Sequence, residues 1–391
     1  MTIQLRDFKL RQRQSASGRK LPSQLPDRLK TMMENANTSF SEKFTGVTTN
    51  GIAVPGLFSI ENTGVSTSSI KDASDAFLGS LTSEQRANTL FPIDSDAWQR
   101  WSNIHIFLMR HGTSLDDMSL AQRDLALALL KESLSPSGFA LARDVMRLNG
   151  AIEEITGKHD EYGEWLYWLS IMGTPSLDKP WGWQIDGHHL IINCFILAGQ
   201  LVMTPLFMGS EPIAVDTGKY AGTRVFQIEE QAGLTLAESL TSEQRSKAVI
   251  SEQLPREVFT TAFRDNFELK YEGIRFDDLA GNQQALMLDL IGTYVNRMPQ
   301  GHAQVKMEEV KKHLSETYLA WMGGMDKESV FYYRIHSPVI LIEFDHLNGI
   351  ALDVDEPTRD HIHTVVRTPN GNDYGKDLLR QHLEQVNHSH S

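Results

Sequence analysis

The chain has 391 residues, of which 40% are hydrophobic and 22% are charged, so it can fold around a large core. Its formal net charge of -13 excludes a general attraction to the phosphates of nucleic acids or to anionic lipids. We therefore expect a soluble globular protein with no nucleic acid and no membrane partner.

The start of the chain lacks the apolar segment that a secretory signal needs. Residues 1–39 begin with basic side chains and few acids, so we expect a flexible arm, with an organelle-targeting peptide as the alternative. Residues 40–69 are dense in Gly, Thr and Asn, which is typical of irregular structure. We take this second segment as a candidate arm for holding another subunit in a homo-oligomer.

Helices are expected over much of residues 70–160 and of 225–325. The motif LTSEQR occurs at 81–86 and at 240–245, and each copy places Thr three residues before Gln, as in a capping box. MSLAQR at 118–123 offers the same chemistry with Ser. The repetition is therefore explained by a shared way of starting helices rather than by a duplicated domain.

Strand-like segments, rich in β-branched and aromatic residues, lie near 165–209 and near 331–367. Each group alone is too small to form a stable sheet, so we expect one mostly antiparallel sheet built from both. With the helices packed on it, the fold class is α+β. Residues 40–385 then form a single intertwined domain, followed by a frayed tail at 386–391.

The longest apolar run, at 190–199, is too short to cross a bilayer and contains Asn193. It also holds Cys194, the one cysteine of the chain, which cannot form an intrachain disulfide. A reducing compartment follows, and we expect a cytoplasmic protein.

Two histidines stand close together in HIHTVVR, at 361–367. Because side chains alternate along a strand, His361, His363 and Arg367 share one face of this segment. In the preceding strand, IEFDH places Glu343 and Asp345 on one face at the strand's end. Two strands thus end in imidazoles, a guanidinium and carboxylates.

A third polar cluster lies in DGHHLIIN, where His189 and Asn193 share one face and Asp186 and His188 share the other. Asn193 stands among apolar residues and needs a hydrogen-bond partner, which favours the His189 side as the polar interior. Trp181 and Trp183 have the same parity as His189, so we expect them, with Asn193, to wall a substrate pocket. The alternative is a bulge at Gly182 or Gly187, which would undo this parity.

These clusters predict a metal site in which ligands come from separate strands of one sheet. Imidazole nitrogens and a carboxylate suit zinc or ferrous iron, and zinc is favoured over iron or copper. The expected ligands are His189, Glu343, His361 and His363. The alternative for each histidine is a structural role with satisfied hydrogen bonds, and Glu343 and Asp345 could simply solvate a strand end.

The other candidate catalytic residues surround this site. Asp345 or His188 would act as a general base or would orient a ligand. Arg367 would bind an anionic part of the substrate or would pair with Asp373. Asp373, after the turn at 369–371, would point back at the histidines or, in the safer interpretation, cap the last helix. The leading hypothesis is a metal-dependent hydrolase of a small or medium organic substrate. The alternatives are an iron or copper oxygenase or other oxidoreductase with the same ligands, and a non-catalytic binding or structural protein.

The chain also resembles a known family over about residues 40–385. The resemblance rests on FTGVTTNGI, FLGSLTSEQRANTLFPID, GTPSLDKPWGWQIDGHHLIIN, TPLFMGSEP, IEFDH and HIHTVVRTPNGNDYGKDLL. It is similar in these motifs to the uncharacterised family called domain of unknown function 3500. The resemblance implies no mechanism or catalytic residues, but the family's GHHL and HIH stretches match His188, His189, His361 and His363.

Overall fold

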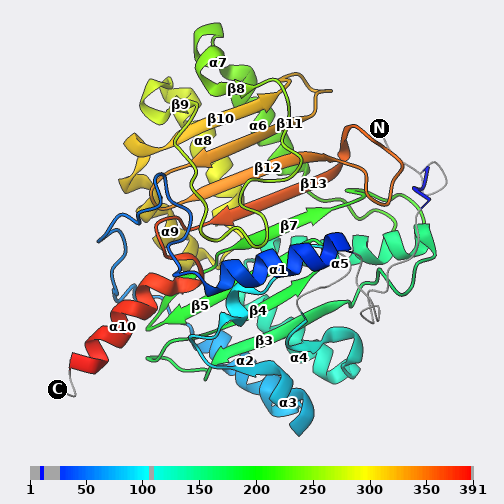
Figure 1. The fold of residues 1–391 in the computed structure, drawn as a ribbon, viewed down its shortest axis with the longest axis vertical. Coiled ribbons are helices and arrows are strands. Elements are labelled where there is room, and N and C mark those ends of the chain that lie inside the picture. The colour runs from blue at the N-terminus through cyan, green and yellow to red at the C-terminus, as the bar shows by residue number, and fades with distance from the viewer. Residues whose placement is uncertain (1–8, 13–26, 105–109, 389–391) are drawn as a thin grey trace.

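The computed structural model describes residues 9–12, 27–104 and 110–388. In this part of the chain, one sheet of thirteen strands forms the centre of the molecule, and its main path runs β1-β3-β4-β5-β7-β13-β12-β11-β10-β8. Only the outermost pairs, β1 with β3 and β8 with β10, are parallel. The predicted α+β class and the single, largely antiparallel sheet built from both groups of strands are confirmed (Figure 1).

The first half of the sheet and its helices come from residues 68–210. Their bounds are α2 Ser68–Ser80, α3 Ser83–Thr89, β1 Leu90–Phe91, β2 Thr113–Ser114, α4 Leu120–Ser133, α5 Pro136–Thr156, β3 Tyr167–Gly173, β4 Trp181–Gly187, β5 Leu190–Leu197, β6 Gln200–Val202 and β7 Leu206–Ser210.

The second half comes from residues 227–367, all of which the structure describes, and repeats this order of elements, except that it has no counterpart of β6. Their bounds are α6 Gln227–Ser239, α7 Ser242–Ala248, β8 Val249–Ser251, β9 Ile274–Arg275, α8 Gly281–Val295, α9 Gln300–Lys312, β10 Tyr318–Gly323, β11 Phe331–His336, β12 Leu341–Asn348 and β13 Pro357–Arg367.

The two halves are joined through β7 and β13, which pair antiparallel in the middle of the sheet. Both LTSEQR copies start equivalent helices, α3 and α7, and both helices run into the outermost strand of their half. The capping glutamines also match: Gln122 donates to Gln85 at 2.7 Å, and Gln283 donates to Gln244 at 2.8 Å. The repeated motif therefore marks equivalent places in a duplicated architecture, which corrects the expectation of helix-start chemistry alone.

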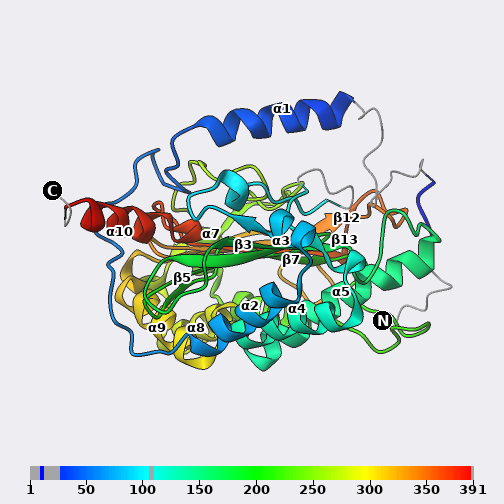
Figure 2. The same cartoon turned by 90° about the horizontal axis from the view of Figure 1, so that it is seen from below.

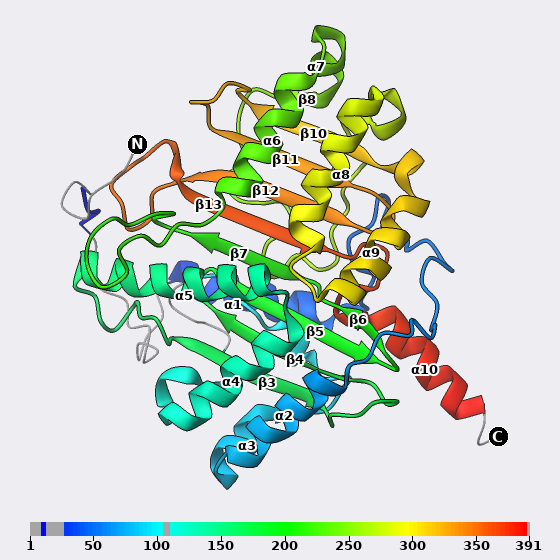
Figure 3. The ribbon, with the colours of Figure 1, turned by 180° about the vertical axis from the view of Figure 1, so that it is seen from behind.

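The helices cover the two faces of the sheet unequally. Helices α2, α4, α5, α6, α8 and α9 lie on one face, here called the helix face (Figure 3). On the opposite loop face lie α1 (Asp27–Ser41) and long connections between strands (Figure 2). Apolar side chains fill both layers, with Trp183 and Val366 among those under the helices and Phe207 and Val365 among those under the loops. The sheet is thus buried on both sides.

The ends of the chain differ partly from the sequence-based expectation. Helix α1 occupies the last part of the predicted flexible arm, because residues 27–41 are helical. Helix α10 (Lys376–His388) extends into the predicted frayed tail. Residues 9–12 of the predicted arm also contact the fold, because Leu10 pairs with Leu352 in an isolated bridge. The other positions of both predicted segments, 1–8, 13–26 and 389–391, lie outside the described residues. Within 42–67 the chain contains no helix and no named strand, in agreement with an irregular arm. No helix in the described part of the chain is long and apolar enough for a membrane crossing.

A buried ion pair ties α6 to the helix face of the sheet. His346 of β12 contacts the Glu230 carboxylate through Nε2 at 3.0 Å, and Arg359 of β13 binds both Glu230 oxygens, at 2.7 and 2.6 Å. Burial raises the pKa of Glu230, but the hydrogen bonds from His346 and Arg359 outweigh it and lower the pKa to about 2. The ionised carboxylate is therefore favoured in the folded state.

Because the pKa of Glu230 is lower when folded, its stabilising effect should be complete above its ordinary pKa of about 4.3 and be lost as pH falls toward 2. We expect Glu230→Gln to lower the free energy of unfolding strongly at pH 6 and less at pH 3.5, measured by urea denaturation. Glu384→Gln, which removes an exposed partner of Arg380, is the control and should change little at either pH. A Glu230→Gln effect of equal size at both values would contradict the assignment.

Candidate metal centre

Three buried imidazoles meet on the loop face at the centre of the sheet. His361 and His363 come from β13, and His189 is the second residue of the two-residue turn between β4 and β5. They are 2%, 4% and 6% exposed, respectively, and one nitrogen of each lies within 4.8 Å of the others. A group with this spacing could hold a metal ion, because imidazole nitrogens are common metal ligands.

A glycine in β7 allows these rings to approach. Gly209 pairs with His363 across the sheet, and its backbone N–H donates to the His189 carbonyl at 2.8 Å. A Cβ at this position would lie 2.7 Å from His363 Cδ2 and 3.2 Å from His189 Cδ2. The same residue thus holds the turn and leaves room for the imidazoles. His189 itself has a φ of 62°, which turns it out of the strand alternation.

The hydrogen bonds of His361 and His363 fix which nitrogen of each ring faces the cluster. His361 Nδ1 lies 2.7 Å from the Asn348 carbonyl oxygen, which can only accept, so Nδ1 carries the proton. His363 Nδ1 lies 2.7 Å from Glu257 Oε1. Burial raises the pKa of Glu257, but the opposite effects, chiefly that of the neighbouring His363, outweigh it, so the pKa lies below its ordinary value. The carboxylate is therefore ionised and also accepts.

Both Nε2 atoms therefore present lone pairs when the rings are neutral, and they face each other at 3.1 Å. Burial lowers the pKa of His361, although Glu211 opposes this shift. The lowered pKa favours the neutral ring. Two acceptor atoms at this distance repel each other unless a proton or a cation lies between them. The geometry is that of a site prepared for a positive charge.

The family model described as "Protein of unknown function (DUF3500)" matches residues 63–376. The chain belongs to this family. The match covers both halves of the sheet and all three histidines of the cluster. No curated protein matches the chain, and no solved structure matches it.

In this DUF3500 chain, Asp345 lies beside the triad. It pairs with His363 across β12 and β13 and therefore shares the loop face with it. Its side chain is fully buried, and neither carboxyl oxygen has a hydrogen-bond partner among the described residues. Burial, reinforced by Glu257 and Glu343, raises the pKa of Asp345 well above its ordinary value.

His188 contacts the triad through its ring, but it is not one of the three histidines that could hold a metal ion. Its ring stacks on His189 with centroids 3.9 Å apart, and its Nδ1 lies 2.8 Å from Asn149 Oδ1. Tyr167 donates to the His188 carbonyl at 3.0 Å. These contacts make His188 a support for the His189 ring.

Glu343, expected as a ligand, has a different set of partners. Its carboxylate accepts from the backbone N–H groups of Phe259 and Thr260, at 2.7 and 2.9 Å. The hydroxyls of Thr260 and Tyr332 donate to it as well, at 2.5 and 2.7 Å. The carboxylate therefore anchors the loop at 252–273 to the sheet, and it does not join the histidines.

Arg367 and Asp373 also hold this loop, and they form the ion pair that was the alternative to a substrate-binding role for Arg367. Arg367 Nη1 donates to Asp265 at 2.7 Å and to Asp373 at 3.2 Å, while Nε and Nη2 donate to the Thr260 carbonyl. Asp373 further accepts from the Thr368 backbone N–H at 2.7 Å, and burial raises its pKa to about 6 against the effect of Arg367. The guanidinium is completely buried, which leaves no surface for an anionic substrate.

The expected substrate-binding residues lie elsewhere in the core. Trp181 and Trp183 belong to the layer under the helices, where Trp183 donates to Ser133 of α4 at 3.1 Å. Asn193 is on the loop face, but it accepts from Gln184 and donates to the Pro205 carbonyl. Strand parity wrongly placed the two tryptophans on the face of His189, because the His188–His189 turn interrupts the strand. Asp186, on the far side of that turn, accepts from the Ser102 backbone N–H.

Sequence reasoning missed Glu257, the Asn348 carbonyl and Gly209. Glu257 lies in a long loop with no periodic pattern, and a backbone carbonyl has no signature in a sequence. Gly209 could have been predicted, because a glycine inside a strand often marks a place where other groups approach closely.

Replacing Gly209 with Ala should disturb the triad directly. The added Cβ would lie 2.7 Å from both His363 Cδ2 and the Ile362 carbonyl oxygen, so ring and backbone must move. We expect overpacking to cost about 1–3 kcal/mol in the free energy of unfolding, and the affinity for zinc to fall with it. Gly79→Ala, at a position in α2 with open space and an ordinary φ, is the control for steric crowding and should leave zinc affinity unchanged. Equal zinc affinities for Gly209→Ala and wild type would contradict the proposed contact.

Proposed function

We propose that this DUF3500 chain is a metal-dependent enzyme that hydrolyses a small or medium organic substrate, with a zinc ion held by His189, His361 and His363. The observation that carries the proposal is the pair of Nε2 atoms facing each other at 3.1 Å while both Nδ1 atoms are engaged. Histidines that bind metals usually donate their other ring N–H to a carboxylate or a carbonyl. Glu257 and the Asn348 carbonyl play these two parts here.

The donor set supports zinc as the preferred ion. Three neutral imidazoles suit zinc, and three protein ligands leave a coordination position open, as in catalytic zinc sites. The chain's one thiol, Cys194, lies in the layer under the helices and is not part of this group. Iron and copper also accept imidazoles, so the identity of the ion separates hydrolysis from the oxidative alternative.

The residues around the triad support hydrolysis. A bound divalent ion lowers the pKa of water to about 7 and so supplies a nucleophile at neutral pH. Glu257 fixes the tautomer of His363 and makes its Nε2 more basic. Asp345, buried next to His363 and without a hydrogen-bond partner among the residues described, is available to exchange a proton with a substrate group. This role for Asp345 is a part of the proposal.

The experiment is elemental analysis of protein purified without a histidine tag. We expect about one zinc per chain, or recovery of one per chain when the metal-free protein is dialysed against zinc. Stoichiometric iron or copper in its place would favour an oxidoreductase. No binding of any of the three ions would remove the enzymatic proposal.

Cobalt substitution then tests the open coordination position. The visible spectrum of the cobalt protein should change with pH around a midpoint near 7, because a solvent molecule at the metal ionises. Cobalt that binds with a pH-independent spectrum between pH 5 and pH 9 would indicate a closed structural site.

A further inference from the structure

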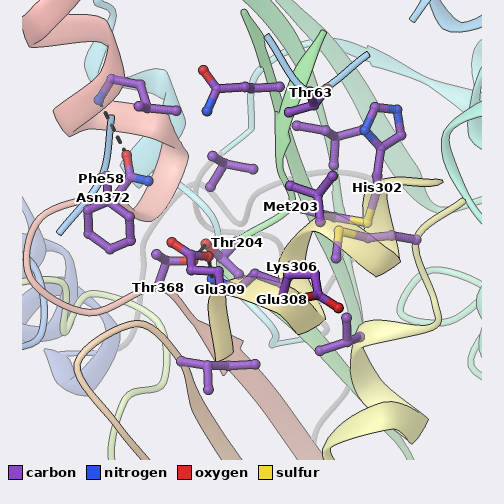
Figure 4. A pocket seen from close by; sticks show the side chains of 18 of the residues that line it. Phe58, Thr63, Met203, Thr204, His302, Lys306, Glu308, Glu309, Thr368 and Asn372 are labelled. Atoms are coloured by element: carbon purple, nitrogen blue, oxygen red, sulfur yellow. Dashed lines mark hydrogen bonds and ion pairs between the residues drawn. The ribbon is translucent and has the colours of Figure 1, made fainter. Parts of the chain in front are cut away.

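A cavity lies away from the metal triad, on the helix face where the two halves of the sheet meet. Its volume is about 320 Å³, and it is enclosed by β6 and β7 of the first half and by α8 and α9 of the second (Figure 4). None of the triad residues lines it. The cavity and the candidate metal centre are therefore separate sites.

The wall of this cavity carries polar side chains and also a continuous set of apolar ones. The apolar set consists of Met203, Leu206, Val295, Met298, Ile340 and Val366. The volume falls in the range of about 300–1,000 Å³ that pockets for small organic molecules occupy. Such a lining favours the apolar part of a ligand, because each buried methylene raises affinity roughly fourfold.

One end of the cavity carries a hydrogen-bond donor. Asn372 is 3% exposed, and its Oδ1 accepts from the Leu378 backbone N–H at 3.4 Å. Its Nδ2 has no acceptor among the residues that the structure describes, and the side chain lines the cavity (Figure 4). The N–H groups of this amide nitrogen can therefore donate to a ligand oxygen in the cavity.

The charges around the cavity favour a neutral ligand. Apart from histidines, two charged side chains of the lining are only partly exposed, namely Lys306 and Glu309. Lys306 Nζ lies 2.7 Å from a carboxylate oxygen of Glu309, so the two form an ion pair. Lys306 also donates to the Val339 carbonyl at 2.8 Å. Since this opposite pair is already formed, neither side chain requires a counter-charge from a ligand.

Residues 57–63, here called the strap, close the cavity from outside. The strap is held by side chains of the surface: Gln200 donates to the Ser59 carbonyl at 3.0 Å and accepts from the Glu61 N–H at 2.8 Å. Gln381 of α10 donates to the Phe58 carbonyl at 2.9 Å. The two bonds to Gln200 are exposed and exchange readily with water, so this part of the strap can open for entry.

We propose that this cavity binds a neutral amphipathic molecule, namely an apolar chain or ring with one amide or carbonyl oxygen that accepts from Asn372 Nδ2. The strap closes over the bound molecule. This site is independent of the proposed metal-dependent function, because it shares no lining residue with the triad.

The test uses octanamide as the probe in calorimetric titration of the full chain. Octanamide should bind once per chain, butanamide at least about a hundredfold more weakly because four methylenes are lost, and octanoate at least about tenfold more weakly. Hydrogen exchange of residues 57–63 should slow when octanamide is present. Binding should persist in His363→Ala, which separates this site from the metal centre.

Two variants and one control locate the binding. Asn372→Asp keeps the acceptor for Leu378 and removes the donor, so octanamide affinity should fall at least about tenfold. Val305→Trp, at a lining residue that is 39% exposed, should obstruct the cavity without entering the core. Leu120→Trp, at an exposed position of α4, is the control, and this variant should bind octanamide like wild type. Absence of octanamide binding, or wild-type affinity in a folded Val305→Trp, would overturn the proposal.

Discussion

His363→Ala should reduce bound zinc from about one ion per chain to a small fraction of that value. The variant removes one of three nitrogens that lie within 4.8 Å of one another, and two remaining imidazoles hold an ion poorly. The loss of affinity should exceed the 10–100-fold that is typical for removing a partner of a ligand. Zinc titration of the metal-free protein, followed by elemental analysis, measures it.

Controls separate this effect from adventitious binding by other histidines. His382→Ala, on α10, should keep full zinc content. The end of the chain reads NHSHS, so replacing His388 and His390 with Gln should remove any weak second ion and leave the first. If His363→Ala retained stoichiometric zinc of wild-type affinity, the triad would not be the site.

Glu257→Gln extends the same experiment to the partner of His363. The amide has nearly the same size, but it is neutral and makes the ring nitrogen less basic. We expect zinc affinity to fall by about 10–100-fold, less than for His363→Ala. Equal affinities for Glu257→Gln and wild type would show that the carboxylate does not support the ligand.

Arg367→Met should produce the largest loss of stability among single changes on the loop face. The guanidinium is fully buried between Asp265 and Asp373, and it also binds the Thr260 carbonyl with two nitrogens. Removing the cation leaves two buried carboxylates without their counter-charge, which costs about 3–5 kcal/mol in the free energy of unfolding. Urea denaturation at neutral pH measures this difference.

The matched control is Arg380→Met, which removes an arginine that also binds two acidic side chains. Those partners, Asp377 and Glu384, lie on the exposed side of α10, and exposed pairs contribute about 0–1 kcal/mol. A loss for Arg367→Met no greater than for Arg380→Met would show that Arg367 is not structural. It would also reopen the earlier expectation that Arg367 binds substrate.

Local patterns predicted part of the site because they depend on strand alternation alone. His361 and His363 share a face of β13, and Asp345 shares it with them, as the period of two requires. The capping boxes of α3 and α7 were equally readable from their sequences. Their equivalence within a duplicated fold became visible only with the pairing of β7 and β13.

The failed assignments concern contacts between distant parts of the chain. Glu343 and Arg367 are bound by residues 259–265, and no local pattern tells which loop will cover a sheet. His189 has a left-handed backbone in a turn, so the strand parity that linked it to Trp183 did not apply, although Asn193 does lie on the same face of the sheet. Glu257 joins His363 across more than a hundred positions in the sequence, which alternation cannot reveal.

Anomalous X-ray scattering shows directly whether the histidine triad holds a metal ion. Crystals grown with one equivalent of zinc should be measured on both sides of the zinc absorption edge. We expect one zinc peak at about 2.0–2.1 Å from a ring nitrogen of each of His189, His361 and His363. A zinc-supplied crystal without a peak at the triad would mean that these histidines do not form the metal site.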